Sequence, residues 1–152
     1  MSIKKIATNR RARFDYEVFD TYEAGLVLMG SEVKSLREGR ANLSDAYAIV
    51  KDEEMWLIGC HISPYPFARG GGHEPDRTRK LLLHRHEIER IRIQIAERGR
   101  TVVPMRMYFK DGKAKLEVGI AKGKDRYDKR ETLKRKQADR EMERAMRYRS
   151  LD

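Results

Sequence analysis

The residues that could do chemistry unaided in this chain of 152 residues are its four histidines and its single cysteine. His84 and His86 stand two positions apart, and on a helix such residues do not share a face, so they cannot grip one metal ion together. His73-Glu74 begins the pattern of a zinc deaminase site, but the Cys-x-x-Cys that completes that site is absent. The sequence therefore predicts no metal site and no cofactor.

Nucleophilic catalysis has equally little support. No Gly-x-Ser-x-Gly is present, and nothing in the sequence identifies a base for Cys60. The run Gly70-Gly71-Gly72 lacks the Gly-Lys-Ser/Thr ending of a phosphate-binding P-loop, so 63–76 is predicted to be a mobile connecting loop. Distant carboxylates could still converge as in a metal-dependent ribonuclease, which stays an alternative. A protein that binds without catalysing a reaction is the main expectation.

Charge points to the kind of ligand. The net charge is +10, and it resides at the two ends. Residues 1–14 contain five Lys or Arg and no acid, and residues 122–152 contain 12 basic and 7 acidic residues, so 15–121 is neutral. A neutral body with basic ends favours an anionic partner, most often nucleic acid. Ends that merely aid solubility are the alternative.

A membrane partner is disfavoured by the same sequence. No segment approaches the ~20 apolar residues of a membrane span, and no apolar stretch of a secretory signal follows the N-terminus. The lone Cys60 cannot form an intrachain disulfide, which fits a reducing compartment and predicts a cytoplasmic protein.

The elements that must position the binding residues are mainly β-strands. Alternating or continuous apolar residues predict strands at 16–20, 25–30, 45–50, 55–62, 101–110 and 113–121, with the last two joined by an Asp111-Gly112 hairpin turn. Pro104 is expected at an edge or bulge. Helical spacing predicts short helices within 31–39, with Ser31 as N-cap, and within 84–99, where a strand is the alternative. Many short strands favour a small closed barrel of about six strands with two or three inserted helices.

The two ends are predicted to differ from this body. Residues 1–14 form a basic arm, loose until an anion orders it, and 15–121 form the barrel. Residues 122–152 form a basic tail of good helix formers with a thin apolar stripe (Leu133, Ala138, Met142, Ala145, Met146). Such a stripe is expected to be too thin to dock on the body, which makes the tail disordered alone and helical on a polyanion.

The chain also resembles a known family, the small protein B family of SsrA-binding proteins, over roughly residues 6–130. The resemblance is carried by the order and spacing of several short segments. They are Asn9-Arg10-Arg11-Ala12-Arg13, Glu23-Ala24-Gly25, Glu32-Val33-Lys34-Ser35-Leu36-Arg37, Arg79-Lys80-Leu81-Leu82-Leu83-His84, Ala121-Lys122-Gly123-Lys124 and Asp128-Lys129-Arg130.

The resemblance implies an OB-type barrel that binds the tRNA-like domain of transfer-messenger RNA and delivers it to stalled ribosomes in trans-translation. It implies RNA contacts by Glu23, Leu82 and His84, with help from Lys122-Gly123-Lys124, although the family commonly has Asn at the His84 position. Glu23, as an acid, either accepts hydrogen bonds from base or ribose or orients a neighbouring Arg. The other expected RNA contacts are basic or polar residues of the arm, the first helix and the segment before Leu82: Asn9, Arg10, Arg11, Arg13, Lys34, Arg37, Arg79 and Lys80.

The tail is implied to act on the ribosome itself. Asp128-Lys129-Arg130 is expected at the decoding site, with Tyr127 placed to stack on a base, while the tail lies as a helix in the empty mRNA channel. The partners are then transfer-messenger RNA and the stalled ribosome, with one copy of the chain on the RNA. A generic OB-fold RNA-binding or ribosomal protein without preference for tRNA-like shape is the alternative.

Overall fold

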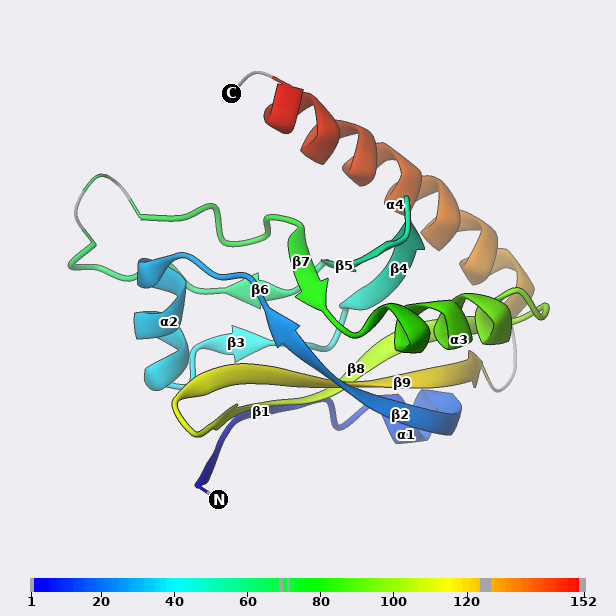
Figure 1. The fold of residues 1–152 in the computed structure, drawn as a ribbon, viewed down its shortest axis with the longest axis horizontal. Coiled ribbons are helices and arrows are strands. Elements are labelled where there is room, and N and C mark those ends of the chain that lie inside the picture. The colour runs from blue at the N-terminus through cyan, green and yellow to red at the C-terminus, as the bar shows by residue number, and fades with distance from the viewer. Residues whose placement is uncertain (1, 69, 71, 124–126, 151–152) are drawn as a thin grey trace.

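The computed structural model describes residues 2–68, 70, 72–123 and 127–150, and within the last range it describes side chains for 134–147. Nine strands and four helices occur in these residues (Figure 1). The strands are β1 (Ile3–Thr8), β2 (Tyr16–Leu26), β3 (Ala41–Asn42), β4 (Tyr47–Lys51), β5 (Glu54–Ile58), β6 (His61–Ile62), β7 (Arg79–Leu82), β8 (Arg100–Lys110) and β9 (Lys113–Gly123). The helices are α1 (Ala12–Asp15), α2 (Gly30–Arg37), α3 (Arg85–Ile95) and α4 (Tyr127–Ser150).

The main sheet closes into a barrel. Its strand order is β1-β8-β4-β5-β7-β2-β9, and β9 also pairs with β8, so β8, β4, β5, β7, β2 and β9 form a ring. β1 lies outside the ring along one end of β8, and β3 pairs with β6 in a separate small sheet. The predicted closed barrel of about six strands is confirmed.

The barrel encloses one main core. Fully buried aliphatic and methionine side chains from most ring strands fill it, and Ile91 of α3 and Leu36 of α2 add to it from outside the ring. Apolar residues alternate with polar ones along β9, which is why that strand can bury one face and leave the other in water. The outer face of the strands is therefore available for a ligand.

Two hairpin turns set the strand register. Asp111 and Gly112 both have positive φ (50° and 81°), as the predicted two-residue turn requires, and they place Lys110 opposite Lys113. The β4–β5 turn uses Asp52 and Glu53 with φ of 54° and 64°, in a conformation that usually takes Asn and Gly. The predicted bulge at Pro104 is confirmed by the register shift between Pro104 and Arg106.

Two predictions for the N-terminal half are wrong, the loose arm and the buried strand at 25–30. Residues 3–8 are not loose: β1 pairs with β8, and Ile6 and Ala7 pack against the core. The segment 25–30 is not a strand buried on both faces, because β2 ends at Leu26 and the side chains of Val27 and Met29 are exposed. In both cases pairing with a distant strand decides the outcome, and local composition does not report such pairing.

Both predicted helices form at their expected places. α2 begins two residues earlier than expected, since its N-cap is Met29, whose backbone N–H donates to Glu32 Oε1 at 2.8 Å, and not Ser31. At α3 the backbone N–H of His84 donates to Glu87 Oε1 at 3.1 Å, which confirms the predicted N-terminus. α3 places His84 directly after β7.

The good helix formers of the tail do form a helix, α4, but this helix docks on the barrel. Ala138 and Met142, one turn apart on α4, are buried, and Ala138 packs with Tyr47 and Ile58. The Tyr47 hydroxyl donates to the Lys134 carbonyl at 3.3 Å. The expectation that the apolar stripe is too thin to dock is therefore wrong, because two small or flexible side chains suffice where the barrel offers an apolar hollow.

Between α4 and the barrel lies a cavity of about 370 Å³. Its walls come from β4, the start of β8 and the first described side chains of α4.

Among the described residues, no helix is long and apolar enough to cross a membrane.

Candidate nucleic-acid interface

The outer face of the barrel carries a row of side chains that crosses five strands. Lys5 of β1 lies opposite Tyr108 of β8, Tyr108 opposite Lys115 of β9, Lys115 opposite Gly25 of β2, and Gly25 opposite Leu82 of β7. Directly paired residues project from the same face of a sheet. Leu81, the neighbour of Leu82, is in the core, so this row faces solvent.

Leu82 gives the row an apolar end. Its side chain is 51% exposed, which is unusual for a leucine held in a strand. Gly25 contributes no side chain beside it, and a Cβ added there would lie 3.3 Å from Leu82 Cβ. Gly25 and Leu82 therefore present a shallow apolar surface that suits the flat face of a base or a ribose.

Glu23 lies two residues before Gly25 in β2, on the same face. Its Oε2 accepts a hydrogen bond from the Tyr108 hydroxyl at 2.5 Å, and Lys110 Nζ lies 3.4 Å from both carboxylate oxygens. The hydrogen bond from Tyr108, with help from Lys110, holds the pKa of Glu23 below its usual value. Burial of the ring and the bond to Glu23 raise the pKa of Tyr108 to about 12. At neutral pH the carboxylate is charged and the phenol is neutral.

Arg106 and Glu117 extend this arrangement. They are cross-strand partners, and Arg106 Nε donates to Glu117 Oε2 at 3.1 Å. The Arg106 guanidinium also lies over the Tyr108 ring, 5.1 Å from its centroid. We call the set Lys5, Glu23, Arg106, Tyr108, Lys110, Lys115 and Glu117 the outer-face cluster.

Of the RNA contacts expected from the sequence, the structure brings Glu23 and Leu82 together on this face. Lys80 projects from the same side of β7 and pairs with Glu54 at 3.0 Å. His84 follows two residues after Leu82, exposed and stacked on His86 with ring centroids 5.5 Å apart. Lys34 and Arg37 are exposed on α2, where Lys34 Nζ lies 5.5 Å from the centre of the Tyr65 ring.

Other expected contacts lie at the opposite end of the barrel. Lys122 is seven residues beyond Lys115 in β9, ~23 Å along an extended strand. Gly123 pairs with Tyr16 there. The exposed Arg10 and Arg11 precede α1 and the exposed Arg13 lies in it, and α1 packs on the same end through Ala12. The basic residues expected to contact RNA are thus divided between the outer face and a second group around α1, and do not form one patch.

Two expected contacts need correction. Asn9 is only 8% exposed, and its side-chain amide donates to the carbonyls of Pro104 (2.9 Å) and Leu43 (3.3 Å). Its donors thus hold β1 to the barrel rather than face a ligand.

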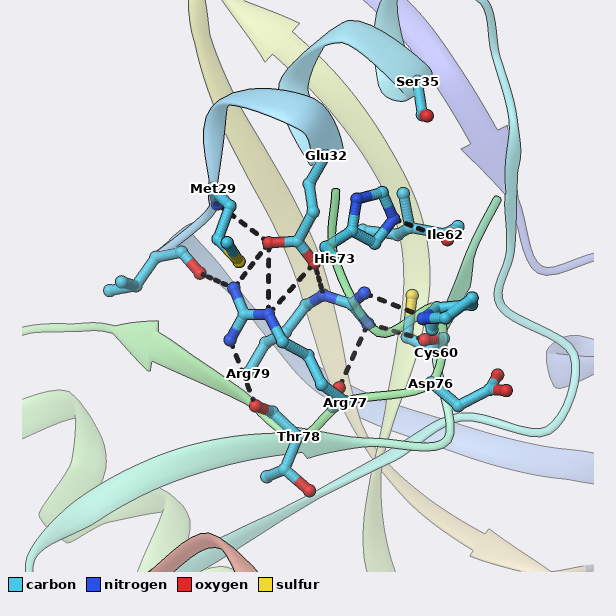
Figure 2. A network of polar contacts seen from close by, with 12 residues as sticks. Met29, Glu32, Ser35, Cys60, Ile62, His73, Asp76, Arg77, Thr78 and Arg79 are labelled. Carbon is cyan, nitrogen blue, oxygen red and sulfur yellow. Dashed lines mark hydrogen bonds and ion pairs between the residues drawn. The ribbon is translucent and has the colours of Figure 1, made fainter. Parts of the chain in front are cut away.

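Arg79 is fully buried, and its role is also structural (Figure 2). Its Nε donates to Glu32 Oε2 at 2.5 Å, while its Nη atoms donate to the carbonyls of Cys60, Arg77 and Pro75. Arg77 pairs with the other oxygen of Glu32, also at 2.5 Å. This network joins α2, the 63–76 loop and β7.

Burial and pairing oppose each other at Glu32. Burial alone would raise the pKa of Glu32, but Arg77, the Met29 N–H and Arg79 outweigh it and hold that pKa below its usual value. The carboxylate therefore stays charged inside the protein. His73, buried beside the network, contacts Ser31 Oγ (2.8 Å) and the Ile62 carbonyl (2.9 Å), so it anchors the loop.

The remaining candidates fall on the tail. Lys124 lies outside the described residues. Tyr127, Asp128, Lys129 and Arg130 begin α4, but their side chains lie outside the described part of the chain.

Sequence reasoning missed most of the outer-face cluster. The Asp111-Gly112 turn fixes the hairpin register, so the pairs Tyr108–Lys115 and Arg106–Glu117 could have been anticipated from it. The approach of Glu23 to Tyr108, 85 positions apart, had no local signal.

Comparisons with known proteins bear on what such a face binds. The family described as SmpB protein matches residues 6–148. The chain belongs to the SmpB family.

Relatives in the SmpB family are similar over nearly the whole chain. The SsrA-binding protein of Anaeromyxobacter sp. (strain K) is 56% identical over 143 residues, which is 94% of this chain and 88% of the relative. That of Geobacter metallireducens is 53% identical over 150 residues (99% and 98%), and that of Geobacillus thermodenitrificans is 55% identical over 146 residues (96% and 94%).

A solved SmpB-family structure has the same fold. It is described as "tmRNA-SmpB: a journey to the center of the bacterial ribosome", and its chain is 44% identical to this one, with a TM-score of 0.69. The match covers 82% of this chain and 88% of that one.

Proposed function

We propose that this chain binds the tRNA-like part of transfer-messenger RNA and delivers it to stalled ribosomes in trans-translation. The observation that carries this is the 53–56% identity, over nearly the full length, to proteins named for binding SsrA, which is transfer-messenger RNA. The described structure of a transfer-messenger RNA–SmpB complex supports the same partners. Because ribosomes are the site of action, the chain works in the cytoplasm.

The barrel supplies a rigid surface for this RNA. Folded RNA is recognised by its shape, its 2′-hydroxyls and its unstacked bases rather than by reading a deep groove. Leu82 over Gly25 offers an apolar contact for one base or ribose, and Lys5 and Lys115 stand in the same row to meet phosphates. Glu23, Leu82 and His84 form the first contact region in this proposal, with Lys80, Lys34 and Arg37 near its border.

The basic group around α1 is the second contact region. Lys122, which marks this region in β9, is ~23 Å from the outer-face row along that strand, so one RNA helix could span both regions. Gly123 and Lys124 lead from this region into the tail. Because one copy of the chain offers both regions, the proposal includes a single copy on each RNA.

The tail is proposed to act after delivery. Tyr127, Asp128, Lys129 and Arg130 contact the decoding site, and the rest of the tail lies as a helix in the mRNA channel when mRNA is missing. Since Ala138 and Met142 bury themselves on the barrel, α4 must leave this site before it can extend.

The chain works by binding and not by catalysis. Cys60 is buried, and burial raises the pKa of its thiol to about 11, so it is a poor nucleophile at neutral pH. Within the described residues, no group of three or more His, Cys, Asp or Glu side chains could hold a metal ion.

Competition binding tests the proposal. Labelled transfer-messenger RNA is bound to the full-length chain, and unlabelled transfer-messenger RNA, ordinary tRNA and an unstructured RNA compete for it across a salt series. Transfer-messenger RNA is expected to compete best. Equal competition by all three RNAs would instead indicate a generic RNA-binding barrel.

A truncated chain tests the division between body and tail. A variant that ends after Ala121 should keep most of its affinity for the tRNA-like RNA and fail to support peptide tagging on stalled ribosomes. Equal loss of binding and of tagging would contradict separate roles for the two parts.

A further inference from the structure

An acid in a face that binds an anion needs an explanation, and Glu23 is such an acid. Its carboxylate accepts from the Tyr108 hydroxyl at 2.5 Å, and Lys110 Nζ lies 3.4 Å from both of its oxygens. Repulsion between a carboxylate and a phosphate opposes direct contact between them. The charge of Glu23 is instead used inside the protein, on two neighbours from β8.

The second acid of the outer-face cluster is engaged in the same way. Glu117 Oε2 accepts from Arg106 Nε at 3.1 Å, and Arg106 Cζ lies over the Tyr108 ring, 5.1 Å from its centre. Tyr108 is only 5% exposed. Its ring is therefore a support for Arg106, not a free surface on which a base could stack.

The two cations that pair with these acids keep part of their side chains exposed to solvent. The Arg106 side chain is 53% exposed and that of Lys110 is 29% exposed. Lys5 and Lys115 flank Tyr108 on its two neighbouring strands, and Lys113 is the partner of Lys110. The four cations of the cluster, with Lys113 beside them, outnumber its two engaged acids and give a face that complements a polyanion such as RNA.

We propose that Arg106 and Lys110 contact RNA phosphates, and that Glu23 is a positioning residue that holds Lys110 directly and Arg106 through Tyr108. This inference rests on the proposed function, because it assigns the RNA contacts of that function to particular side chains. A direct bond from Glu23 to a base or ribose is the competing explanation.

The two explanations differ in how Glu23 and Tyr108 combine. Tyr108→Phe removes one hydroxyl and leaves the carboxylate, so a Glu23 that touches RNA directly would lose its own contact independently of Tyr108. If Glu23 instead acts through Tyr108 and Lys110, the losses of affinity in the two variants are not independent, because either substitution breaks the same support.

The experiment measures the affinity of full-length variants for a labelled tRNA-like fragment by fluorescence anisotropy across a salt series. The variants are E23Q, Y108F, E23Q/Y108F, K110M and E23Q/K110M. The control is R92Q, an exposed substitution on α3 outside the cluster. E23Q and Y108F are each expected to weaken binding about tenfold, and the double variant by about the same factor.

The slope of log affinity against log salt gives a second measurement, which would not change if Glu23 only stabilised the fold. K110M should lower the slope of log affinity against log salt by about one phosphate contact, ~0.7–0.9. E23Q should lower it by a similar amount, because Lys110 loses its orientation, and E23Q/K110M should lower it no further. A contact from Glu23 to a base or ribose leaves the slope unchanged.

Several outcomes overturn the inference. If the affinity loss of E23Q/Y108F equals the product of the losses in E23Q and Y108F, or if E23Q leaves the salt slope unchanged, then Glu23 contacts RNA itself. Wild-type affinity in K110M would show that Lys110 does not contact RNA. Urea midpoints measure whether each variant folds. If Y108F does not fold, the comparison of E23Q, K110M and E23Q/K110M, at more exposed positions, tests the inference alone.

The failure of this inference is distinct from failure of the proposed function. If wild-type protein prefers transfer-messenger RNA to tRNA while the cluster variants give one of the overturning outcomes, only the assignment of these side chains is lost. If the wild type shows no preference, the proposed function falls whatever the variants do.

Discussion

Arg79 and Glu32 form an ion pair in which neither side chain is exposed to solvent. Removing one partner of such a pair leaves a buried charge without compensation, whereas an exposed pair contributes little. Arg79 joins strand β7, which carries Leu82, to helix α2 and the 63–76 loop. A residue without access to RNA can therefore still support the binding face.

We expect Arg79→Met to lower the free energy of unfolding by ~3–5 kcal/mol, because Glu32 then loses one of its two guanidinium partners inside the protein. Arg85→Met is the matched control, since the Arg85–Glu53 pair has side chains 85% and 76% exposed, and it should change stability by at most ~1 kcal/mol. Urea denaturation followed by circular dichroism measures both. Similar small losses in the two variants would contradict a structural role for Arg79.

Glu32 also makes stability depend on pH. Its pKa is lower in the folded chain than in the unfolded one, where a glutamate titrates near ~4.3. Its contribution is therefore fully present above that unfolded value and is lost as pH falls through the folded value. Urea midpoints measured from neutral pH down to acid should fall less steeply for Glu32→Gln than for the wild type. Glu53→Gln, at an exposed position, should keep the wild-type slope, and identical slopes in all three would argue against this account.

At the scale of elements, the two hairpin turns differ in how well their residues suit them. Asp111-Gly112 has glycine at its second position of positive φ, while the Asp52-Glu53 turn has glutamate there, with φ of 64°. A non-glycine residue in this region costs roughly 1–2 kcal/mol. The β4–β5 connection therefore stores strain that the β8–β9 connection avoids.

Glu53→Gly is expected to stabilise the protein by ~0.5–1 kcal/mol, and Gly112→Ala to destabilise it by about the same amount. Thermal unfolding of the two variants checks both signs in one experiment. The strain argument fails if Glu53→Gly is no more stable than the wild type while Gly112→Ala behaves as expected.

The tail helix is the element on which sequence reasoning was least complete. Local composition correctly predicts a helix, since residues 127–150 are mostly good helix formers without proline. Docking depends on a hollow formed by Tyr47 and Ile58, which become neighbours of Ala138 only after the barrel closes. The same limit applies to β1, whose partner strand lies a hundred positions away.

We expect Ala138→Arg to release α4 from the barrel, because a long cation cannot occupy the space beside Tyr47 and Ile58. Hydrogen exchange should then show faster amide exchange in 134–147 and unchanged protection in β8 and β9. Arg140→Ala, at an exposed position of α4, serves as the control and should keep the tail protected. Equal protection in the two variants would mean that the docking contact does not hold the helix.

At the scale of the whole molecule, the charge is divided between a neutral body and two basic ends. The sequence alone was enough to predict this division, the closed barrel and the hairpin at its centre, because each follows from composition or a local turn. It could not reveal that Asn9 and Arg79 face inward, since both are polar residues of a kind usually found on surfaces. The hydrogen-bond partners that decide their orientation are distant in the sequence: two lie 34 and 95 positions from Asn9, and Glu32 lies 47 positions from Arg79.

The affinity of the full chain for transfer-messenger RNA should fall steeply with salt, by roughly 10³–10⁵ between 50 and 200 mM if ~6–10 phosphates are contacted. The variant that ends after Ala121 loses a net charge of +5 and should show a shallower slope. Filter binding at several salt concentrations measures both slopes. A flat response in the full chain would mean that apolar contacts, rather than cations, dominate binding.

The cavity of about 370 Å³ beneath the docked helix α4 could hold a ligand that stabilises the docked tail. In the proposed function the tail exchanges between this docked form and an extended form in the mRNA channel, so its apparent affinity for the channel is scaled down to the undocked fraction. Linkage is reciprocal. A small molecule that wedges α4 against β4 would hold the tail in its docked population and so act as an inhibitor of rescue without touching RNA.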